Sequence, residues 1–385
     1  MGNAAVVIGG GIGGLAAAIG LRRIGWEATV IERAPRLEDA GAGISLAANG
    51  LRALDELGVG AAVREASRGQ YSGGTRVPRG GWLARMDGSA LERAVGTPIM
   101  GIERSTLHRL LRDRLPAEAL LIGFEAGPVE QTGTGTVRVR CGERVLNADL
   151  VVAADGVGSQ VRAHLFPTHP GPVYSGSTVL RAITEKPIDL PNDFELSWGH
   201  GEEFGHIALP DGRAEWHAVL NLPSRTRFAD PLAELRGRFR TWHSPIPALL
   251  DATQAAAVMH HDVNELRTPL PSYTAGRTAL LGDAAHAMTP NLGQGACQAL
   301  EDAVTLAAAL ATEPTIETAL ARYDAERRPR SQAVARAARQ AGKMGQQLSH
   351  PLAVALRNTA MRLTPNRAAT HMILRHHAWV PPRLH

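Results

Sequence analysis

The stretch "AAVVIGGGIGGLAAAIGLRRIGWEATVIERA", residues 4–34, decides the predicted fold. An apolar run of strand character enters a glycine-rich turn, a helical pattern follows, and a second apolar strand ends at Glu32. Gly9, Gly11 and Gly14 have the G-x-G-x-x-G spacing, which allows a tight turn, close approach to a pyrophosphate and close packing of helix on strand. The N–H groups that open the helix would face the phosphates, and Glu32 could accept hydrogen bonds from an adenosine ribose. These residues predict a dinucleotide site but do not decide between NAD and FAD.

Two further motifs follow the same rule that ligands bind beyond the carboxyl ends of parallel strands. In "DLVVAADGVGSQVR", residues 149–162, a strand ends at Asp155-Gly156, which alone could be an ordinary turn. In "ALLGDAAHAMTPNLGQGACQALEDAV", residues 279–304, a strand is expected to end at Asp283. A loop of prolines and glycines then leads to a helix expected from about Gly295. The carboxylate would suit ribose or ribityl hydroxyls, and the helix N-terminus would favour an electron-rich group.

Composition limits the possible classes of protein. The 385 residues are 44% hydrophobic and 20% charged, as in a soluble globular protein of two or three domains. The formal charge of +4 comes from scattered arginines, so we expect no nucleic-acid partner. Two cysteines cannot form a disulfide framework. No signal peptide pattern precedes the first strand, and no apolar run reaches the length of a membrane span. We therefore expect a cytoplasmic protein with no membrane partner.

The remaining patterns indicate how the chain is organised. Helical periodicity is expected in residues 41–66, and again in residues 103–115 with Ser105 as the N-cap. Residues 170–269 contain short alternating segments, and Asp211-Gly212 predicts a hairpin turn between two of them. Apolar strand and long helices return after residue 277. The prediction is an α/β nucleotide-binding domain that is interrupted by a β-rich insertion and closed by a helical C-terminus.

Taken together, the three motifs resemble those of the FAD-dependent aromatic hydroxylases, the single-component group A flavoprotein monooxygenases with the p-hydroxybenzoate hydroxylase fold. The resemblance extends to "GAGISLAANG" at 41–50 and "RSTLHRLL" at 104–111, and it is strongest for small enzymes similar to urate hydroxylase and 3-hydroxybenzoate 6-hydroxylase. It implies a Rossmann-like FAD-binding domain interrupted by a β-rich substrate domain. The implied segments are FAD-binding at 1–75, 101–169 and 270–340, a substrate-domain hairpin at 76–100, the substrate domain at 170–269, and C-terminal helices at 341–385.

The resemblance also implies which residues hold a non-covalent FAD. The expected contacts are Gly9, Gly11, Ile12, Gly13 and Gly14 at the pyrophosphate, Glu32 and Arg33 at the adenosine ribose, Gly43 and Ser45 at the flavin, Arg104 at the phosphate or ribityl chain, Val129 at the adenine, Asp155 at FAD and NAD(P)H, Asp283 at the ribityl-phosphate segment, and Pro290, Gly293, Gln294, Gly295, Ala296 and Cys297 along the isoalloxazine ring.

The implied reaction uses NAD(P)H to reduce FAD and adds O₂ at the flavin C4a. Oxygen then passes to an electron-rich carbon of a small aromatic or heteroaromatic substrate. The protein would exclude water and take a proton from the substrate. No metal is expected, because HxxxH and CxxC spacings are absent and the pairs His260-His261 and His376-His377 are predicted to lie on the surface. A monomer or a homodimer is expected.

Substrate-facing residues are expected in the insertion. On "AEWHAVLN", residues 214–221, alternation places His217 on the face opposite Trp216. His217 lies near the position where relatives similar to urate hydroxylase have a tyrosine, so it is a candidate proton acceptor, with a packing histidine as the alternative. Arg181 could pair with a substrate anion or with Glu185, and His206 is a weaker candidate of the same kind.

Two other functions remain open at this level. A flavoenzyme of this fold could oxidise or rearrange its substrate without inserting oxygen. An NAD-dependent dehydrogenase would use the first glycine motif alone, and a yellow purified protein would exclude it.

Overall fold

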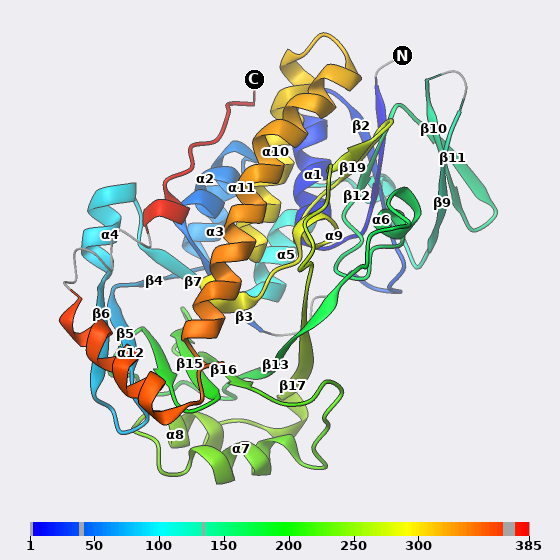
Figure 1. Ribbon diagram of the computed structural model, residues 1–385. Coiled ribbons are helices and arrows are strands. Elements are labelled where there is room, and N and C mark those ends of the chain that lie inside the picture. The colour runs from blue at the N-terminus through cyan, green and yellow to red at the C-terminus, as the bar shows by residue number, and fades with distance from the viewer. Residues whose placement is uncertain (1–2, 38–41, 133–134, 365–373, 385) are drawn as a thin grey trace.

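The computed structural model describes residues 3–37, 42–132, 135–364 and 374–384 (Figure 1). Its first layer is a six-stranded sheet. Neighbouring strands are parallel except for the two at one edge, which form a short antiparallel hairpin. In sheet order the strands are β18 (Thr274–Ala275), β19 (Thr278–Leu280), β12 (Leu150–Ala153), β1 (Ala4–Ile8), β2 (Glu27–Glu32) and β8 (Leu120–Ile122). The strands β1, β12 and β19 are buried on both faces, as expected for a sheet covered by helices.

Helices cover the sheet and extend from it to the far end of the molecule. The helix α1 (Ile12–Arg23) connects β1 to β2 and packs on α10 (Gly295–Thr312). The long helix α11 (Ile316–Met344) lies beside α10 and reaches the lower part of the molecule in Figure 1. Shorter helices pack around them: α2 (Ala48–Glu56), α3 (Gly60–Glu65), α5 (Arg104–Arg112), α6 (Gln160–Leu165) and α9 (Asp283–His286).

Two small sheets flank this layer. One contains β3 (Gly43–Leu46), β7 (Ile99–Glu103) and β4 (Arg68–Gln70), all antiparallel. The other is a meander of β9 (Ala126–Gln131), β10 (Val137–Cys141) and β11 (Arg144–Ala148), which projects at the upper right of Figure 1. Short 3₁₀ turns occur at 117–119, 255–257 and 290–292.

The insertion forms a seven-stranded sheet at the lower end of the molecule (Figure 1). Its strands are, in order, β17 (Met259–Glu265), β13 (Val173–Ile183), β16 (Ala214–Leu220), β15 (Glu202–Ala208), β14 (Phe194–Trp198), β5 (Ser72–Arg76) and β6 (Trp82–Asp87). The hairpin predicted at Asp211-Gly212 joins β15 to β16, with Gly212 at a φ of +82°. Because β5 begins at Ser72, the boundary expected at residue 75 falls inside this strand.

The protein has two separate hydrophobic clusters. The larger contains the six-stranded sheet with α1, α2, α5 and α10. The smaller lies between one face of the insertion sheet, where Trp216 and Ala218 are buried, and the helices α7 (Pro231–Phe239) and α8 (Ile246–Asp251). The two clusters have no residue in common. The α/β fold with a β-rich insertion and a helical C-terminus is thus confirmed.

Three local expectations need adjustment. The helix expected in residues 41–66 is divided, because β3 precedes α2 and a turn at Gly58, with φ of +76°, separates α2 from α3. Ser105 is not an N-cap: α5 begins one residue earlier, and the Ser105 hydroxyl donates to the Glu103 carboxylate. The segment 76–100, expected as a hairpin, also contains the helix α4 (Gly88–Val95), which follows the β5–β6 hairpin.

The helix α12 (Pro351–Leu363) lies against β6 at the lower left of Figure 1, and the described residues 374–384 follow it in the sequence. Among the described helices, none combines the length and the apolar composition that a bilayer crossing requires.

Candidate active site

In the glycine-rich turn after β1, a side chain would fit at one glycine and would clash with backbone atoms at two others. A Cβ on Gly9, whose φ is +109°, would lie 2.3 Å from the Ala154 carbonyl oxygen, and one on Gly14 would lie 1.9 Å from the Gly9 carbonyl oxygen. Both positions therefore require glycine. A Cβ on Gly11 would meet no atom within 4 Å, so space remains beside this backbone at the start of α1. Ile12 and Gly13 supply the first N–H groups of that helix.

Two side chains hold this turn in place. The Glu32 carboxylate accepts from the N–H groups of Gly10 at 2.7 Å and Ala34 at 2.8 Å, while Arg33 beside it is exposed. His108 of α5 is buried and its Nε2 lies 2.7 Å from the Gly10 carbonyl oxygen. Sequence reasoning missed His108, although it stands one helical turn after Arg104 on the same face. The two contacts hold the N–H and the carbonyl of one residue, Gly10, and so fix the two successive peptides next to the open space.

The second and third motifs meet at Arg162. This buried guanidinium donates to the carbonyl oxygens of Val157 at 2.7 Å and Ala284 at 3.0 Å. Burial lowers the pKa of Arg162, and the charges of Asp155 and Asp283 oppose that effect. Asp155 and Asp283 therefore both lie within electrostatic reach of one cation, although 128 residues separate them in the sequence.

Asp155 and Asp283 differ in their surroundings. One Asp155 oxygen accepts from the N–H groups of Gln160 and Val161, while its buried Oδ1 has no partner among the described residues. Asp283 is exposed. The expectation that it ends a strand is wrong: β19 ends at Leu280, and Gly282, with φ of +61°, turns the chain so that Asp283 is the first residue of α9.

The loop between α9 and α10 leaves space along its glycines. Pro290 begins a 3₁₀ turn and is exposed, and Gly293 ends it with a φ of +61°. A Cβ on Gly293 or Gly295 would meet no atom within 4 Å. The buried Gln294 side chain accepts from Asn49 Nδ2 at 2.9 Å. Gln294 Nε2 and Asn49 Oδ1 remain buried and unpartnered within the described part of the chain, so this loop has hydrogen-bonding capacity to spare.

Cys297 points away from that loop. A Cβ on Gly50 of α2 would lie 2.7 Å from the Cys297 Sγ, so the thiol fills the space that Gly50 leaves. Burial raises the pKa of Cys297 to about 11, and the thiol is neutral. Only the main chain of Ala296 and Cys297, in the first turn of α10, could reach a ligand.

A buried ionic cluster connects α10 and α11 to the start of α9. Asp302 of α10 accepts from the Gly282 N–H at 3.0 Å, lies 2.5 Å from His286 Nε2, and accepts from Arg327 Nε at 2.7 Å. Burial alone would raise the pKa of Asp302, but the charges of His286 and Arg327 outweigh that effect and lower the pKa to about 2. Arg327 also pairs with Glu301, which accepts from Asn49. The sequence carries one signal of this cluster, two acids within the otherwise apolar run of α10.

The seven-stranded insertion sheet contacts the small sheet of β3, β7 and β4 at Gly43 of β3. Its carbonyl oxygen accepts from Arg181 Nη2 at 2.6 Å, and a Cβ there would lie 2.5 Å from the Glu215 Cβ. Ser45 lies two residues further along β3, and the Arg104 N–H donates to the Ala42 carbonyl oxygen at 2.7 Å. Val129 is buried in β9 of the meander.

The face of the insertion sheet that is turned toward Gly43 carries a polar cluster. His217 and Arg181 are cross-strand partners on β16 and β13. The Nδ1 of His217 lies 3.5 Å from a Glu215 oxygen and its Nε2 lies 3.8 Å from a Glu203 oxygen. Both glutamates are buried, whereas the His217 side chain is 24% exposed. The second Glu203 oxygen accepts from Trp198 Nε1 at 2.6 Å.

The charges in this cluster favour a protonated imidazole. Burial lowers the pKa of His217, but the hydrogen bond and charge of Glu215 and the charge of Glu203 outweigh it, so the pKa is raised. Burial raises the pKa of Glu203, and His217 and Trp198 oppose that effect. His217 is therefore a stronger proton acceptor than a free histidine. The sequence pattern did not reveal Glu203 and Glu215 as its partners.

The other candidates have different partners. Arg181 pairs with Glu215 at 3.4 Å, not with Glu185, and its buried Nε has no partner among the described residues. His206 lies on the opposite face of the sheet, where Trp216 is its cross-strand partner and its Nε2 is 3.2 Å from the Asn192 carbonyl oxygen. Burial lowers the pKa of His206. It is a packing residue on the side of α7 and α8.

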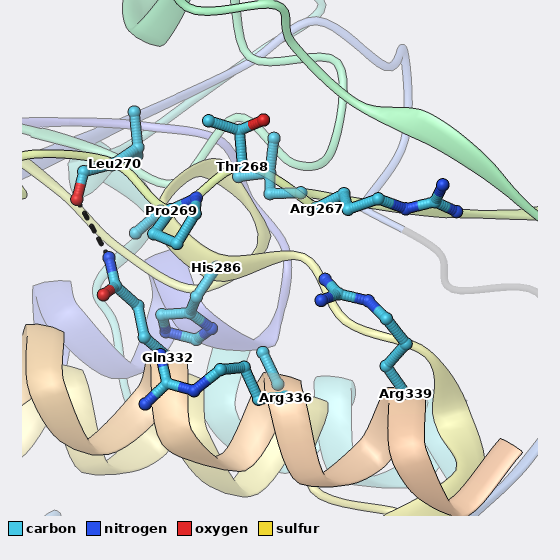
Figure 2. Close-up of a pocket in the computed structure, with 11 residues that line it drawn as sticks. Arg267, Thr268, Pro269, Leu270, His286, Gln332, Arg336 and Arg339 are labelled. Atoms are coloured by element: carbon cyan, nitrogen blue, oxygen red, sulfur yellow. Dashed lines mark hydrogen bonds between the residues drawn. The ribbon is translucent and has the colours of Figure 1, made fainter. Parts of the chain in front are cut away.

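Figure 2 shows a separate small pocket between the loop 266–270 and α11. Its volume of about 20 Å³ has room for little more than one water molecule. Arg267 and Arg339 are among its lining residues, but both pair with Glu265, at 3.3 and 2.7 Å. Gln332 donates to the Leu270 carbonyl oxygen at 2.9 Å. This pocket is too small and too well neutralised for an anionic ligand.

The residues around the two glycine loops fit FAD. Gly11, Gly293 and Gly295 leave open space, Asp155 Oδ1 and Gln294 Nε2 are buried polar atoms awaiting a partner, and Asp283 is an exposed acceptor at the same edge of the sheet. Together they offer donors for phosphate and ring oxygens and acceptors for hydroxyls.

Comparison with known proteins agrees with this geometry. Residues 3–338 match the FAD binding domain family. The chain is 39% identical over 344 residues to the aurachin C monooxygenase/isomerase of Stigmatella aurantiaca, covering 89% of each chain. It is 33% identical over 375 residues to the 2-heptyl-3-hydroxy-4(1H)-quinolone synthase of Pseudomonas aeruginosa, covering 94% of each. Among solved structures, HpxO of Klebsiella pneumoniae with FAD and uric acid matches with a TM-score of 0.91 and 25% identity, over 99% of this chain and 97% of that one. This chain belongs to the FAD binding domain family and is an FAD-dependent monooxygenase of the aromatic hydroxylase type.

Proposed function

We propose that this protein uses NADH or NADPH and O₂ to oxygenate a nitrogen-containing heteroaromatic ring of the 4-quinolone type. The observation that carries the proposal is the polar cluster of His217, Glu203, Glu215 and Arg181 on the sheet face turned toward β3. A substrate between this face and the loop 290–297 would have a proton acceptor on one side and the cofactor on the other.

FAD would be held by the two glycine loops, with Asp283 and Asp155 at its hydroxyl groups. Non-covalent FAD, once reduced, would supply the activated oxygen. The protein's own part is to position the ring, exclude water and move one proton. Gly9, Gly11 and Gly14 shape the pyrophosphate turn, and the peptide N–H groups of 293–297 would line the flavin.

His217 would take a proton from the substrate as oxygen is transferred. An enol, phenol or ring N–H loses its proton in this step, and the developing negative charge makes the ring carbon more nucleophilic. Glu203 and Glu215 stabilise the imidazolium that forms. Arg181, tied to Gly43 and Glu215, keeps its Nε available and would orient a substrate oxygen.

The charges of the site favour a substrate without a carboxylate. The two buried glutamates beside His217 are already balanced by His217 and Arg181, so a substrate carboxylate would add an uncompensated negative charge in a medium of low dielectric. A ring N–H and a ring carbonyl would instead complement one acceptor and one donor. One of the relatives is named a 2-heptyl-3-hydroxy-4(1H)-quinolone synthase, which supports a quinolone-type ring with an alkyl chain.

The relative named a monooxygenase/isomerase favours a second candidate function. In this version oxygen insertion is followed by rearrangement of the product within the same site. We place the enzyme in the cytoplasm, because both of its cysteines are buried free thiols. We propose that it is a monomer or a homodimer.

The test is a substrate panel scored by stimulated NADH and NADPH oxidation and by ¹⁸O₂ incorporation. It should contain 4-quinolones with and without a 2-alkyl chain, urate, salicylate and 4-hydroxybenzoate. We expect a product that carries one ¹⁸O atom from a quinolone, with benzoates inactive. Stimulated oxidation by a benzoate alone would overturn the quinolone assignment, and product without ¹⁸O would overturn the oxygenase assignment.

A further inference from the structure

The helix α12 presents an apolar face to solvent. Leu352, Leu356 and Leu363 are 76%, 73% and 77% exposed. Their spacing of four and seven residues places all three on one side of the helix. Val354 and Arg357 on the other side are buried against the protein. A row of three exposed leucines on one helix is the kind of surface that marks an interaction site.

The charged residues of α12 and of the sequence after it are all arginines. No Asp or Glu occurs after Glu326 in the sequence, and α12 itself contains none. Arg362 is exposed at the end of the helix, and a Cβ on Gly81 of the β5–β6 hairpin would lie 3.7 Å from its Nη2. The exposed Arg79 and Arg85 lie on that same hairpin. The apolar row is therefore bordered by arginines.

The helix is also connected to the substrate side of the molecule. The buried Arg357 donates to the Gly345 carbonyl oxygen at 2.8 Å and lies over the Trp198 ring, 5.1 Å from its centroid. Trp198 donates to Glu203, which is the partner of His217. One chain of direct contacts thus leads from α12 to the polar cluster.

We propose that α12 docks the enzyme on the surface of an anionic lipid bilayer. Leucines would enter the boundary between headgroups and acyl chains, and the bordering arginines would lie at the level of the anionic headgroups. Nucleic acid would attract the arginines but would leave the leucines in water. A second copy would bring two basic borders together across a twofold axis, which repulsion disfavours.

This proposal departs from the expectation of no membrane contact, which rested on the absence of a spanning segment. A helix that lies in the surface needs no such segment. Docking would place the substrate side near the bilayer, where an alkylated ring accumulates. The binding test below contains no substrate, so its result does not depend on the proposed reaction.

The experiment is cosedimentation of the full-length, FAD-loaded protein with lipid vesicles. One set consists of phosphatidylcholine alone and the other of equal parts phosphatidylcholine and phosphatidylglycerol. We expect binding to the anionic vesicles, weakened by raising the salt from about 0.05 to about 0.5 M. The variant Leu352→Ser/Leu356→Ser/Leu363→Ser should bind about tenfold more weakly or worse.

Val145→Ser is the matched control, because Val145 is an exposed apolar residue, 47% exposed, on β11 at the other end of the molecule (Figure 1). It should bind like the wild type. Unchanged FAD content in all variants shows that they are folded. The proposal is overturned if the wild type stays in the supernatant or if the triple variant binds as well as the wild type. A triple variant that only changes from dimer to monomer in light scattering would also overturn it and identify a contact between copies.

Discussion

At the scale of single residues, the placement of His217 depends on a glycine on the neighbouring strand. Gly205 is its cross-strand partner on β15. A Cβ on Gly205 would lie 2.5 Å from His217 Nε2 and 2.6 Å from Cε1. The imidazole therefore lies over the Gly205 Cα, between the carboxylates of Glu203 and Glu215. The glycine is part of the site although it brings no functional group.

Replacing His217 by Ala should uncouple the reaction. NAD(P)H consumption should stay within a few-fold of wild type, because reduction of the flavin does not use this proton acceptor. Product per NAD(P)H should fall by about 10²-fold, with release of H₂O₂, if general-base assistance is the whole contribution. The measurement is product and H₂O₂ formed per NAD(P)H consumed. Full coupling in the variant would make His217 a packing residue.

The same assignment predicts a pH dependence. A neutral imidazole accepts the proton, and His217 is neutral only above its pKa. Since that pKa is raised, coupling in the wild type should decline as the pH falls through a value above the ordinary 6.5. A coupling profile with its midpoint below 6.5 would contradict the arrangement of Glu203 and Glu215.

Gly205→Ala tests the same geometry without removing a functional group. The added methyl must push the imidazole off the strand, so product per NAD(P)H should fall as it does for His217→Ala, with FAD content unchanged. Gly237→Ala is the control, because Gly237 is exposed in α7 and its Cβ would meet nothing within 4 Å. Coupling that survives in Gly205→Ala would show that the imidazole can work from another position.

At the scale of elements, α10 and α11 are joined by the ionic cluster of Arg327, Glu301 and Asp302. All three side chains are buried, so removal of Arg327 leaves Glu301 with Arg330 alone and Asp302 with His286 alone. Arg327→Met should lower the free energy of unfolding by about 3 kcal/mol or more. Arg322→Met removes a half-exposed partner of Glu326 and Glu313 from the same helix and should cost about 0–1 kcal/mol. Urea unfolding at pH 7 measures both, and equal losses would contradict the role given to the cluster.

The acid side of the stability profile follows from Asp302. Its pKa is 3.8 in the unfolded chain and about 2 in the folded protein. Its contribution is therefore present above pH 3.8 and is lost as the pH falls toward about 2.

Elements were predictable from the sequence where local patterns determine them. Strand, glycine turn and helix at residues 4–34, the Asp211-Gly212 hairpin and the start of α10 near Gly295 all have short-range signals. The end of the strand before Asp283 was misplaced because Gly282 adopts a positive φ that apolar periodicity does not reveal. Glu203 and Glu215 could not be identified as partners of His217 because cross-strand register depends on pairing between distant segments. Of the two partners considered for Arg181, a substrate anion and Glu185, the second is replaced by Glu215 for the same reason.

At the scale of the whole molecule, the cofactor should be removable and should stabilise the fold. FAD at 100 times its dissociation constant would add about 2.7 kcal/mol to the free energy of unfolding. Acid precipitation should release the flavin into the supernatant.

Asp283→Ala should lose about ten- to a hundredfold in FAD affinity, because a carboxylate that accepts from hydroxyls contributes about 1.5–3 kcal/mol. Yellow colour kept in the pellet would contradict non-covalent binding, and unchanged affinity in the variant would contradict the role of Asp283.

The overall architecture was predictable because the three motifs occur in one order over nearly the entire chain. The substrate side was not, because its residues come from β13, β15 and β16 and share no sequence motif. The joint between the two parts, Gly43 with Arg181, connects residues 138 positions apart and gives no local signal.

The two hydrophobic clusters, which have no residue in common, have an evolutionary consequence. Substitutions that repack the insertion around Trp216 do not disturb the packing around β1 and α10, so the two parts can accumulate changes independently. A duplicated gene could thus acquire a new substrate by mutation within residues 173–265 while inheriting its oxygen chemistry intact. Divergence among descendants should then concentrate in that segment, with the contact at Gly43 as the position that both lineages must retain.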